Sequence, residues 1–580
     1  MTTLENFVQK FLSLDHQLLP ETILQIRLLE WWILLTIGIY LIFNVMRVVE
    51  NAGPAFSTTF LKWALLVAIC VNVFLLRIAS PARGFETMEM YDGVHYTAGA
   101  DRLIKEKSFS LPINEENHPV GKAPGFSLLI APIYLFFPNN LGAAVFVPMI
   151  LGLLSLFLLY RLSFRLAGEE TALVALLLLG FSPLHIVYSR LIMPSMGPLF
   201  CILLATFSFT KKSAGFKTIF CAGVLLGFAG VIRYLAVAAI PATLVYLLTR
   251  QDDSSSLRAK KMAFLLLGAA FPLVWLFYFQ WKEFGSAWLT GYSYWEFLSS
   301  NMQKPFSFTY AFGIPPSSGG SPNALFALIS ATGAHIPYPN ILKSRPDQII
   351  YAYLIGFFAL RGLSDFYRQD RPFFYFIVLF FIGLYLPHAL LFSQAGHFML
   401  PIVPFILLAT AKGIVAIFKK IPMRGLLIAN LAFIPFAYTF SHQPFETNRR
   451  DFLQMIEKNV PQKNFFITDF DAILLTHLIG SPKQITTIAL SDDILYADRL
   501  LYFHGKTLPP ALWGATNHPD KIKTLLAKGE RIYLSRFSKE NFKKEYEKLS
   551  DAFDLKPVAN FKNYRLYELK LSGSEKLMKE

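Results

Sequence analysis

Charged side chains are scarce in this chain of 580 residues. Asp, Glu, Lys and Arg make up only 16% of it, whereas 54% is hydrophobic and the mean hydropathy is +0.44. A soluble protein of this length carries about a quarter charged residues. Apolar runs of about 20 residues, the length that crosses a bilayer, recur along the sequence. These features predict a polytopic α-helical membrane protein.

Cysteine is nearly absent as well. The three cysteines, Cys70, Cys201 and Cys221, each lie inside an apolar segment, which excludes a disulfide framework and a cysteine-based zinc site. No small-residue cleavage site ends the first apolar run, which starts near Leu29, so we expect an uncleaved anchor. Internal repeats and Gly-rich phosphate loops are also missing, and nothing indicates a nucleotide site.

The positive charge has a membrane explanation. The net charge of +15 does not indicate nucleic acid, because Lys and Arg concentrate in the cytoplasmic loops of membrane proteins. We expect about twelve spans. They lie near residues 29–48, 61–79, 141–161, 171–189, 195–210, 217–232, 234–249, 262–281, 349–361, 372–393, 398–418 and 422–440.

The basic residues fall at alternate ends of successive spans. Those that share one end are Arg161, Arg165, Lys211, Lys212, Arg250, Arg258, Lys260, Lys261, Arg361, Arg368, Arg371, Lys419, Lys420 and Arg424. The positive-inside rule assigns this end to the cytoplasm. Residues 80–140, residues 282–348 and everything after about 441 are then outside, in a plasma (inner) membrane protein whose outer parts face the periplasm or exterior. The apolar segment 125–137 is too short to cross and predicts a juxtamembrane or re-entrant helix.

We divide the chain into an N-terminal region with an extra span (1–60), a membrane module (61–440) and an extracytoplasmic C-terminal domain (441–580). In the last part, short apolar runs such as FFITDF, QITTIAL and RIYLSRF alternate with amphipathic stretches such as DKIKTLLAKG and NFKKEYEKLSDAF. This alternation predicts a small α/β domain.

Acidic residues gather where the chain leaves the second span. Glu86, Glu89 and Asp92 are spaced by three and would share one face of a helix. A solvated interfacial helix explains Glu86, Glu89 and Asp101. Asp92 differs because the stretch YDGVHY holds it against apolar surface, where a carboxylate is costly unless it is paired or used as a base. Both interpretations stay open on these residues alone.

Two cations face the same outer side. Lys122 precedes a Pro-Gly pair and the short apolar helix, and snorkelling along the interface would explain it. Arg233 lies between two apolar half-spans, where an ionisable residue is a functional candidate by default. A guanidinium and an ammonium together suit a phosphate or diphosphate.

Five stretches in a fixed order carry a family resemblance. These are Asp92 with Tyr96 after the span 61–79, KAPGFSLLIAPIYLFF, RLSFRLAGEETALVALLLLGFSPLHIVYSR, GVLLGFAGVIRYLAVAAIPA and GHFMLPIVPFILLATAKG. Over roughly residues 60–440 the chain resembles GT-C membrane glycosyltransferases of the family 39 type, which include protein O-mannosyltransferases and lipid A aminoarabinose transferases.

The resemblance implies a glycosyltransferase that takes a sugar from a polyprenyl-phosphate donor on the outer leaflet. Its partners would be that lipid-linked sugar, an acceptor hydroxyl in the cell envelope and membrane lipid, with no nucleic acid. Asp92 matches the loop aspartate that serves as general base. Lys122 and Arg233 match basic residues that hold the donor phosphate. The residues flanking these motifs, Glu89, His95, Tyr96 and Arg190, are candidates for substrate binding.

Three departures from the family pattern affect the site residues. Gly93 follows Asp92 where the family often has Glu, and Met193, Pro194 and Ser195 stand where a second acid is common. Gly396 and His397 replace an Arg-Tyr pair, so His397 takes over donor phosphate binding. His95, His118 and His397 lack a zinc-ligand spacing, so no cofactor is predicted and a divalent metal is unsupported.

Two other classes of function stay open. A lipid or glycan transporter, or a flippase, would also need many spans and buried cations, but it would show repeat symmetry and broken midplane helices, and neither is evident in the sequence. A non-catalytic envelope-assembly protein would follow if the departures mean lost activity, and the retained Asp92 argues against it.

Overall fold

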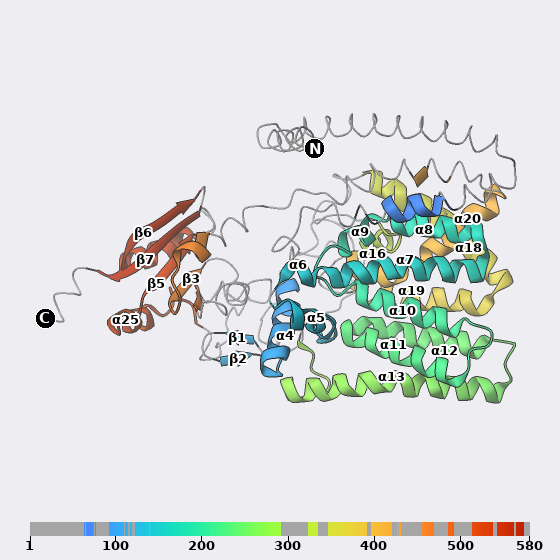
Figure 1. Cartoon of the computed structure of the whole chain (residues 1–580), viewed down its shortest axis with the longest axis horizontal. Coiled ribbons are helices and arrows are strands. Elements are labelled where there is room, and N and C mark those ends of the chain that lie inside the picture. The colour runs from blue at the N-terminus through green and yellow to red at the C-terminus, as the bar shows by residue number, and fades with distance from the viewer. Residues whose placement is uncertain are drawn as a thin grey trace.

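The structure is a computed structural model of the chain (Figure 1). It describes residues 92–109, 111–113, 116–118, 122–138, 140–291, 323–334, 346–390, 396–419, 455–468, 485–491, 513–536, 542–561 and 564–572, with parts of 63–76 and 426–430. The predicted span 29–48, most of 422–440, and Glu86 and Glu89 lie outside the described residues.

Five helical segments in the described part are long and apolar enough to cross a bilayer. They contain α6 (Leu141–Ala144) with α7 (Phe146–Ala167), α13 (Ser255–Phe284), α18 (Pro346–Gln369), α19 (Arg371–Leu390), and η3 (Gly396–Ile402) with α20 (Val403–Phe418). The prediction of a multi-pass membrane protein is confirmed, whereas the number of twelve spans stays a prediction.

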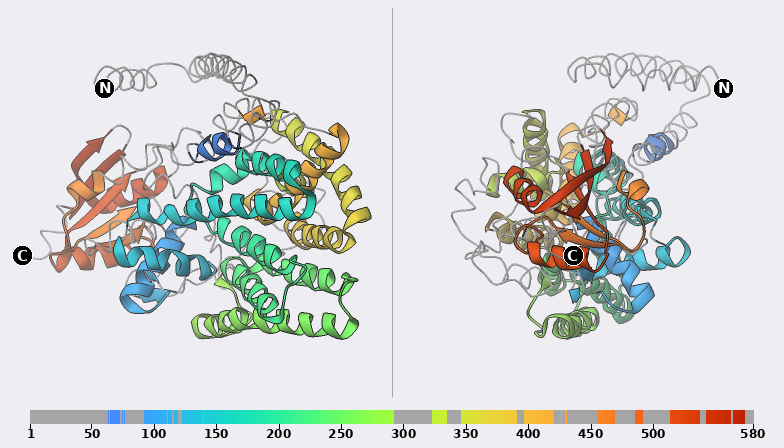
Figure 2. Two further views of the ribbon diagram at one scale, coloured as in Figure 1. Left: turned by 45° about the vertical axis from the view of Figure 1, so that its right-hand side comes forward. Right: turned by 90° about the vertical axis from the view of Figure 1, so that its left-hand side faces the viewer.

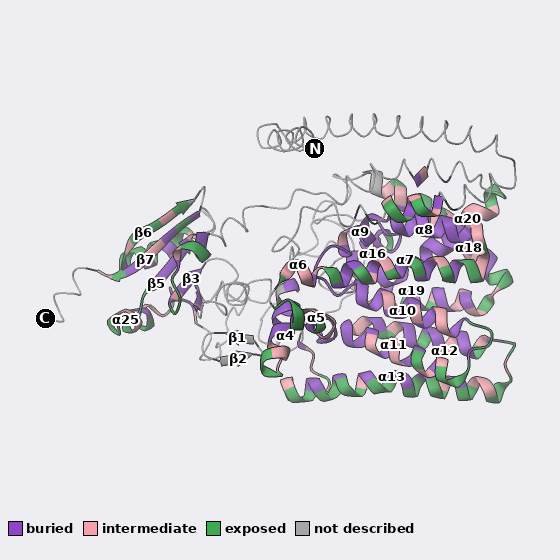
Figure 3. Ribbon diagram, viewed as in Figure 1, coloured by how far each residue is buried: buried purple, intermediate pink, exposed green. Residues whose placement is uncertain are grey.

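Shorter apolar helices complete the bundle. They are α8 (Glu169–Gly180), α9 (Pro183–Tyr188), α10 (Met196–Phe209), α11 (Phe216–Ile232), η2 (Tyr234–Ala238), α12 (Ala239–Thr249) and α16 (Asn323–Ala331). Figure 3 shows α8 almost fully buried and α13 with an exposed outward face. That face carries Phe271, Tyr278 and Trp281, which suits contact with lipid.

The predicted span 171–189 is not one helix. α8 ends at Gly180, and Ser182 caps the start of α9 by accepting a hydrogen bond from the His185 N–H. The Ser182 hydroxyl also donates to the carbonyl of Gly333, 3.0 Å away. Pro183 has no N–H and cannot continue a helix. The expectation of unbroken spans was wrong here, and the Ser-Pro pair marks the break.

Glycine permits two close helix crossings. A Cβ added at Gly362 of α18 would overlap the carbonyl of Ala409 on α20, and one at Gly413 of α20 would overlap the carbonyl of Phe358 on α18. Gly268 of α13 meets the Phe220 carbonyl of α11 in the same way. Helices in lipid lack a hydrophobic driving force between them, so small residues that allow close packing hold such pairs together.

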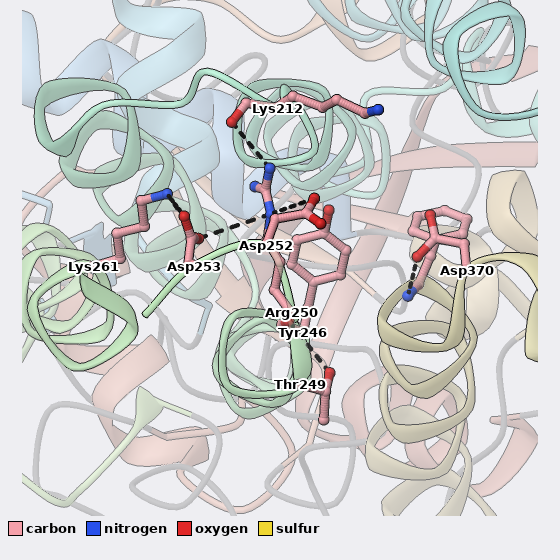
Figure 4. A network of polar contacts seen from close by, with 9 residues as sticks. Lys212, Tyr246, Thr249, Arg250, Asp252, Asp253, Lys261 and Asp370 are labelled. Atoms are coloured by element: carbon pink, nitrogen blue, oxygen red, sulfur yellow. Dashed lines mark hydrogen bonds and ion pairs between the residues drawn. The ribbon is translucent and has the colours of Figure 1, made fainter. Parts of the chain in front are cut away.

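Basic and acidic residues from neighbouring loops form a network of polar contacts (Figure 4). Arg250, just after α12, donates from Nη2 to the carbonyl of Lys212, 3.0 Å away in the loop between α10 and α11. Its Nε lies 3.8 Å from Asp253, whose other neighbour is Lys261 at 2.8 Å. Asp370, between α18 and α19, accepts the Phe373 N–H, and burial raises the pKa of its carboxyl. The loops at Lys212 and Arg250 are therefore in direct contact, as the grouping of basic residues predicted, and the grouping of all five loops stays a prediction.

Asp253→Asn is expected to lower the free energy of unfolding by about 3 kcal/mol, because it removes the carboxylate charge that lies beside two buried cations, leaving Lys261 unpaired and Arg250 with only the exposed Asp252. Asp252→Asn is the matched control: the Asp252 side chain is 72% exposed against 10% for Asp253, so its loss should cost less than about 0.5 kcal/mol. Thermal unfolding in detergent measures both. Equal effects of the two changes would show that Asp253 does not anchor the loops.

Residues 455–572 contain a small mixed sheet. Its strands are β3 (Phe465–Thr468), β4 (Thr486–Ala489), β5 (Ile532–Arg536), β6 (Phe553–Phe561) and β7 (Tyr564–Leu571), in the order β4-β3-β5-β7-β6. β3 runs parallel to β4 and β5, and β7 runs antiparallel to β5 and β6. With α25 (Pro519–Ala527) and α26 (Lys543–Ala552), the sheet confirms a C-terminal α/β unit.

The segment before α6 lies toward the same end of the bundle as this sheet (Figures 1 and 2). It contains α4 (Asp92–Glu106), a hairpin of β1 (Leu111–Ile113) and β2 (Glu116–His118), and α5 (Gly125–Phe136). α5 has 12 residues, which confirms the predicted short helix. Among these elements, α4 carries the candidates Asp92, His95 and Tyr96.

Candidate active site

Arg233 lies at the end of α11, where the backbone turns extended before η2 begins. Its Nη1 donates to the Ser195 hydroxyl at 3.3 Å and to the His397 carbonyl at 3.2 Å, and its Cζ lies 4.6 Å from the centre of the Phe398 ring. Both hydrogen bonds come from Nη1, so the donors on Nε and Nη2 have no partner among the described residues. This half-buried guanidinium keeps two donor groups for an anion.

His397 is held beside Arg233 by its own contacts. The side chain is buried in η3, its Nδ1 is 3.0 Å from the hydroxyl of Tyr188, and the two rings lie 4.7 Å apart. Tyr188 is the last residue of α9, so the break after α8 is what brings it here. The carbonyl of His397 therefore reaches Arg233 while its ring packs on Tyr188; its role toward a donor phosphate stays a prediction.

At its start, α5 packs against α11 and α10, and this contact is the junction of the candidate site. A Cβ added at Gly125 would lie 2.6 Å from the backbone nitrogen of Ile232, the last residue of α11. Gly197 in the first turn of α10 packs on the side chain of the same Ile232. Lys122 precedes Gly125 by three residues, and Arg233 follows Ile232 directly. Each of the two predicted phosphate-binding cations is thus close in sequence to a residue of this contact, and their joint role toward a phosphate stays a prediction.

The helix α4 packs against the start of α5. α4 begins at Asp92, and one turn later the buried Tyr96 packs edge-on against Phe126 of α5, with ring centres 5.2 Å apart. Gly99 is in close contact with Ser127. Four residues of helix rise about 6 Å. The backbone of Asp92 therefore starts a helix that crosses α5 beside its first turn.

Asp101 was interpreted wrongly as a solvated residue of an interfacial helix. It is only 4% exposed, and its carboxylate pairs with Lys105 of the same helix at 2.9 Å. An acid and a base four residues apart on a helix form such pairs, so the spacing carried a signal that could have shown it. Asp101 is a structural residue of α4.

The remaining candidates lie on several other parts of the chain. His95 is buried on α4, next to Tyr96, and Arg190 is buried between α9 and α10. Glu89 lies outside the described residues, and His118 lies on β2. Their roles in substrate binding stay predictions. In the part of the chain that is described, no three His, Cys, Asp or Glu side chains gather as metal ligands would.

Four residues of the site were not found from the sequence as members of it. Ser195 and Tyr188 hold Arg233 and His397, and Phe398 and His388 complete the cluster, with the His388 ring stacked 4.8 Å from that of Phe398. A histidine in the otherwise apolar segment FIVLFFIGLYLPHAL was a signal for His388. Nothing local marks the other three.

Comparison with known proteins finds likeness in a family model and in solved structures. Residues 117–278 match the family model described as dolichyl-phosphate-mannose-protein mannosyltransferase. No curated protein sequence matches the chain. The structure of ArnT from Cupriavidus metallidurans in the apo state matches with a TM-score of 0.58 and 12% identity, over 89% of this chain and 98% of that one. The same values hold for ArnT bound to undecaprenyl phosphate.

A second solved structure shares the architecture. The archaeal oligosaccharyltransferase AglB from Archaeoglobus fulgidus, in complex with an inhibitory peptide and a dolichol-phosphate, matches with a TM-score of 0.51 and 11% identity, over 82% of this chain and 70% of that one. At such identities the likeness shows the fold. The resemblance to GT-C membrane glycosyltransferases of the family 39 type that the sequence indicated is confirmed.

Proposed function

We propose that this chain of GT-C fold transfers a sugar from a polyprenyl-phosphate donor to an acceptor hydroxyl on the outer face of the membrane. The observation that carries the proposal is the junction at the start of α5. There Gly125 packs on the end of α11, beside Arg233, while α4, which begins at Asp92, packs on the next residue of α5, Phe126. We propose that this short helix brings the acid and the two cations into one site.

The donor side rests on positive charge. Arg233 offers Nε and Nη2 to the phosphate oxygens in the planar fork that suits them, and Lys122 adds a point charge. The first turn of α10, which follows Ser195, adds the positive end of a helix dipole. These groups favour the anion that forms when the sugar leaves, since negative charge grows on the bridging oxygen.

The acceptor side needs a base. The acceptor oxygen forms a bond to the anomeric carbon, the bond from that carbon to the phosphate oxygen breaks, and its electron pair stays on the polyprenyl phosphate. The hydroxyl proton passes to the carboxylate of Asp92. A phosphate leaves without a strong general acid, so a single carboxylate suffices.

The named neighbours support the class of donor. ArnT was solved with undecaprenyl phosphate and AglB with a dolichol-phosphate, so both bind polyprenyl phosphates. We propose that the same class of lipid brings the sugar to this chain, and that the acceptor is a glycan, lipid or protein of the cell envelope.

Orientation follows from the basic loops. If the end that holds Arg250 and Lys212 is cytoplasmic, Arg233, which lies at the opposite end of α11, faces the outer side. The C-terminal sheet lies toward that end too (Figures 1 and 2). We place the protein in the plasma (inner) membrane, with the active site and this sheet facing the periplasm or exterior.

A lipid flippase is the second candidate, because the break between α8 and α9 is the type of helix interruption that transporters use. The purified chain separates the two functions. Glycosyl transfer predicts that radiolabelled sugar moves from a polyprenyl-phosphate sugar to an envelope acceptor in detergent, where no bilayer has two sides. Movement of lipid across a vesicle without sugar transfer would establish the flippase instead.

Arg233→Ala is expected to weaken undecaprenyl phosphate binding about 10- to 100-fold, since hydrogen bonds to a charged group are lost. Arg233→Lys should give a smaller loss, because the charge is kept and the planar fork is not. Arg371→Ala is the control, being an exposed cation at the opposite end of the bundle. Isothermal titration in nanodiscs measures all three. Unchanged binding by Arg233→Ala would remove the guanidinium from the donor site.

A further inference from the structure

His388 is a buried histidine beside the proposed phosphate site. It lies in the last turn of α19, is 4% exposed, and stacks on the Phe398 ring with centres 4.8 Å apart. The guanidinium of Arg233 lies over the same ring, with its Cζ 4.6 Å from the ring centre. Phe398 therefore places an imidazole and a guanidinium in one small region, although the two residues are 155 positions apart in the sequence.

The contacts of His388 fix the role of each ring nitrogen. Nδ1 contacts the carbonyl of Leu384, which can only accept, so Nδ1 carries the hydrogen. Burial favours the neutral imidazole, in which Nε2 then presents a lone pair. Among the described residues Nε2 is buried and has no hydrogen-bond partner. An acceptor buried in this way is costly unless a ligand or water supplies a donor.

The chemistry of the donor lipid limits what that partner can be. A phosphodiester has oxygen acceptors and no hydrogen to give, so it does not satisfy Nε2. A sugar hydroxyl does, and the sugar is attached directly to the phosphate that Arg233 would hold. An ammonium group would also donate, but the nearby Arg233 guanidinium repels a second positive charge.

We infer that His388 accepts a hydrogen bond from a hydroxyl of the donor sugar, and so selects a neutral sugar that carries a hydroxyl at that position. The inference rests on the proposed function, because it needs a polyprenyl-phosphate sugar at Arg233. His388 is then a specificity residue, and Phe398 is a positioning residue that orients it against the donor.

The test compares two kinds of lipid on the full chain in nanodiscs at about pH 8, where a phosphate monoester with a pKa near 6 has lost its last proton. The first is undecaprenyl phosphate, and the second is a set of undecaprenyl phosphates that carry glucose, galactose, mannose or arabinose. His388→Phe keeps a ring on Phe398 and removes the acceptor. His388→Gln keeps an acceptor oxygen close to the position of Nε2.

We expect wild-type protein to bind at least one glycosylated lipid more tightly than the bare lipid. His388→Phe should lose that preference by about 10-fold or more and leave bare-lipid binding within about twofold, and His388→Gln should restore part of it. An equal loss for both lipids would place His388 on the phosphate, and no loss would give it a packing role; either overturns the inference. Wild-type protein that binds neither lipid would overturn the proposed function first.

Discussion

Asp92→Asn is expected to lower turnover about 10²- to 10⁴-fold, the usual contribution of a positioned general base. Acceptor hydroxyls hold their proton far above neutral pH, and an amide cannot take it. Asparagine is nearly isosteric and suits the start of a helix as well as aspartate does, so α4 should still form. The loss should appear in kcat, measured as sugar transferred by purified protein, and the KM for the lipid donor should stay near the wild-type value.

The control for this experiment is Glu86→Gln. Glu86 is an equally acidic residue six positions earlier, interpreted as solvated, and its change should leave turnover within about twofold. Donor binding to the Asp92→Asn protein, followed with undecaprenyl phosphate, separates a lost base from a lost fold. Near wild-type turnover by Asp92→Asn would move the base to another residue of the outer loop, such as Glu89 or His95.

Gly362→Ala and Gly413→Ala are each expected to lower the free energy of unfolding by about 3 kcal/mol. At both positions the added methyl group meets a backbone carbonyl of the facing helix, which cannot rotate away as a side chain could. α18 and α20 must then separate. Because α20 continues from η3, which holds His397 against Arg233, donor binding should weaken together with stability.

Gly356→Ala is the matched control, because Gly356 lies on the same helix α18 and has nothing within 4 Å of an added Cβ. Alanine is a better helix former than glycine by about 1 kcal/mol, so this change should stabilise the protein slightly. The same substitution is thus expected to have opposite signs six residues apart. Unfolding in detergent that shifts in one direction for all three variants would contradict the close crossing.

Hydropathy and charge predicted the parts of this protein that are set locally. A bilayer imposes length and apolarity on each span, so α13 and α19 could be read from composition, and the rows of basic residues correctly grouped loops that meet at Arg250. Short alternating runs likewise predicted β3 and β5. Arg233 stood out because a charge in an apolar setting is rare enough to need a reason.

Contacts between distant segments were beyond such reasoning. The hydrogen bonds from Arg233 to Ser195 and His397 join residues 38 and 164 positions apart, and no periodicity encodes them. The break in the span 171–189 was missed because the segments on either side of Ser182 and Pro183 are apolar. A 19-residue hydropathy window that covers both segments therefore scores as one continuous span. Asp101 was missed for a different reason: its partner Lys105 was visible in the sequence, but burial was not.

The contact between Gly125 and Ile232 bears on how precisely the groups of the proposed reaction can be positioned. Reactive groups misplaced by about 1 Å lose on the order of 10² in rate, so the distance between acid and cation must be held closely. The contact between α5 and α11 is main chain against main chain at Gly125 and Ile232, whereas α4 meets α5 through the rings of Tyr96 and Phe126. On the α11 side, side-chain fluctuations therefore add little to the error, so we expect the backbone of Arg233 to keep its position against α5 within a fluid bilayer.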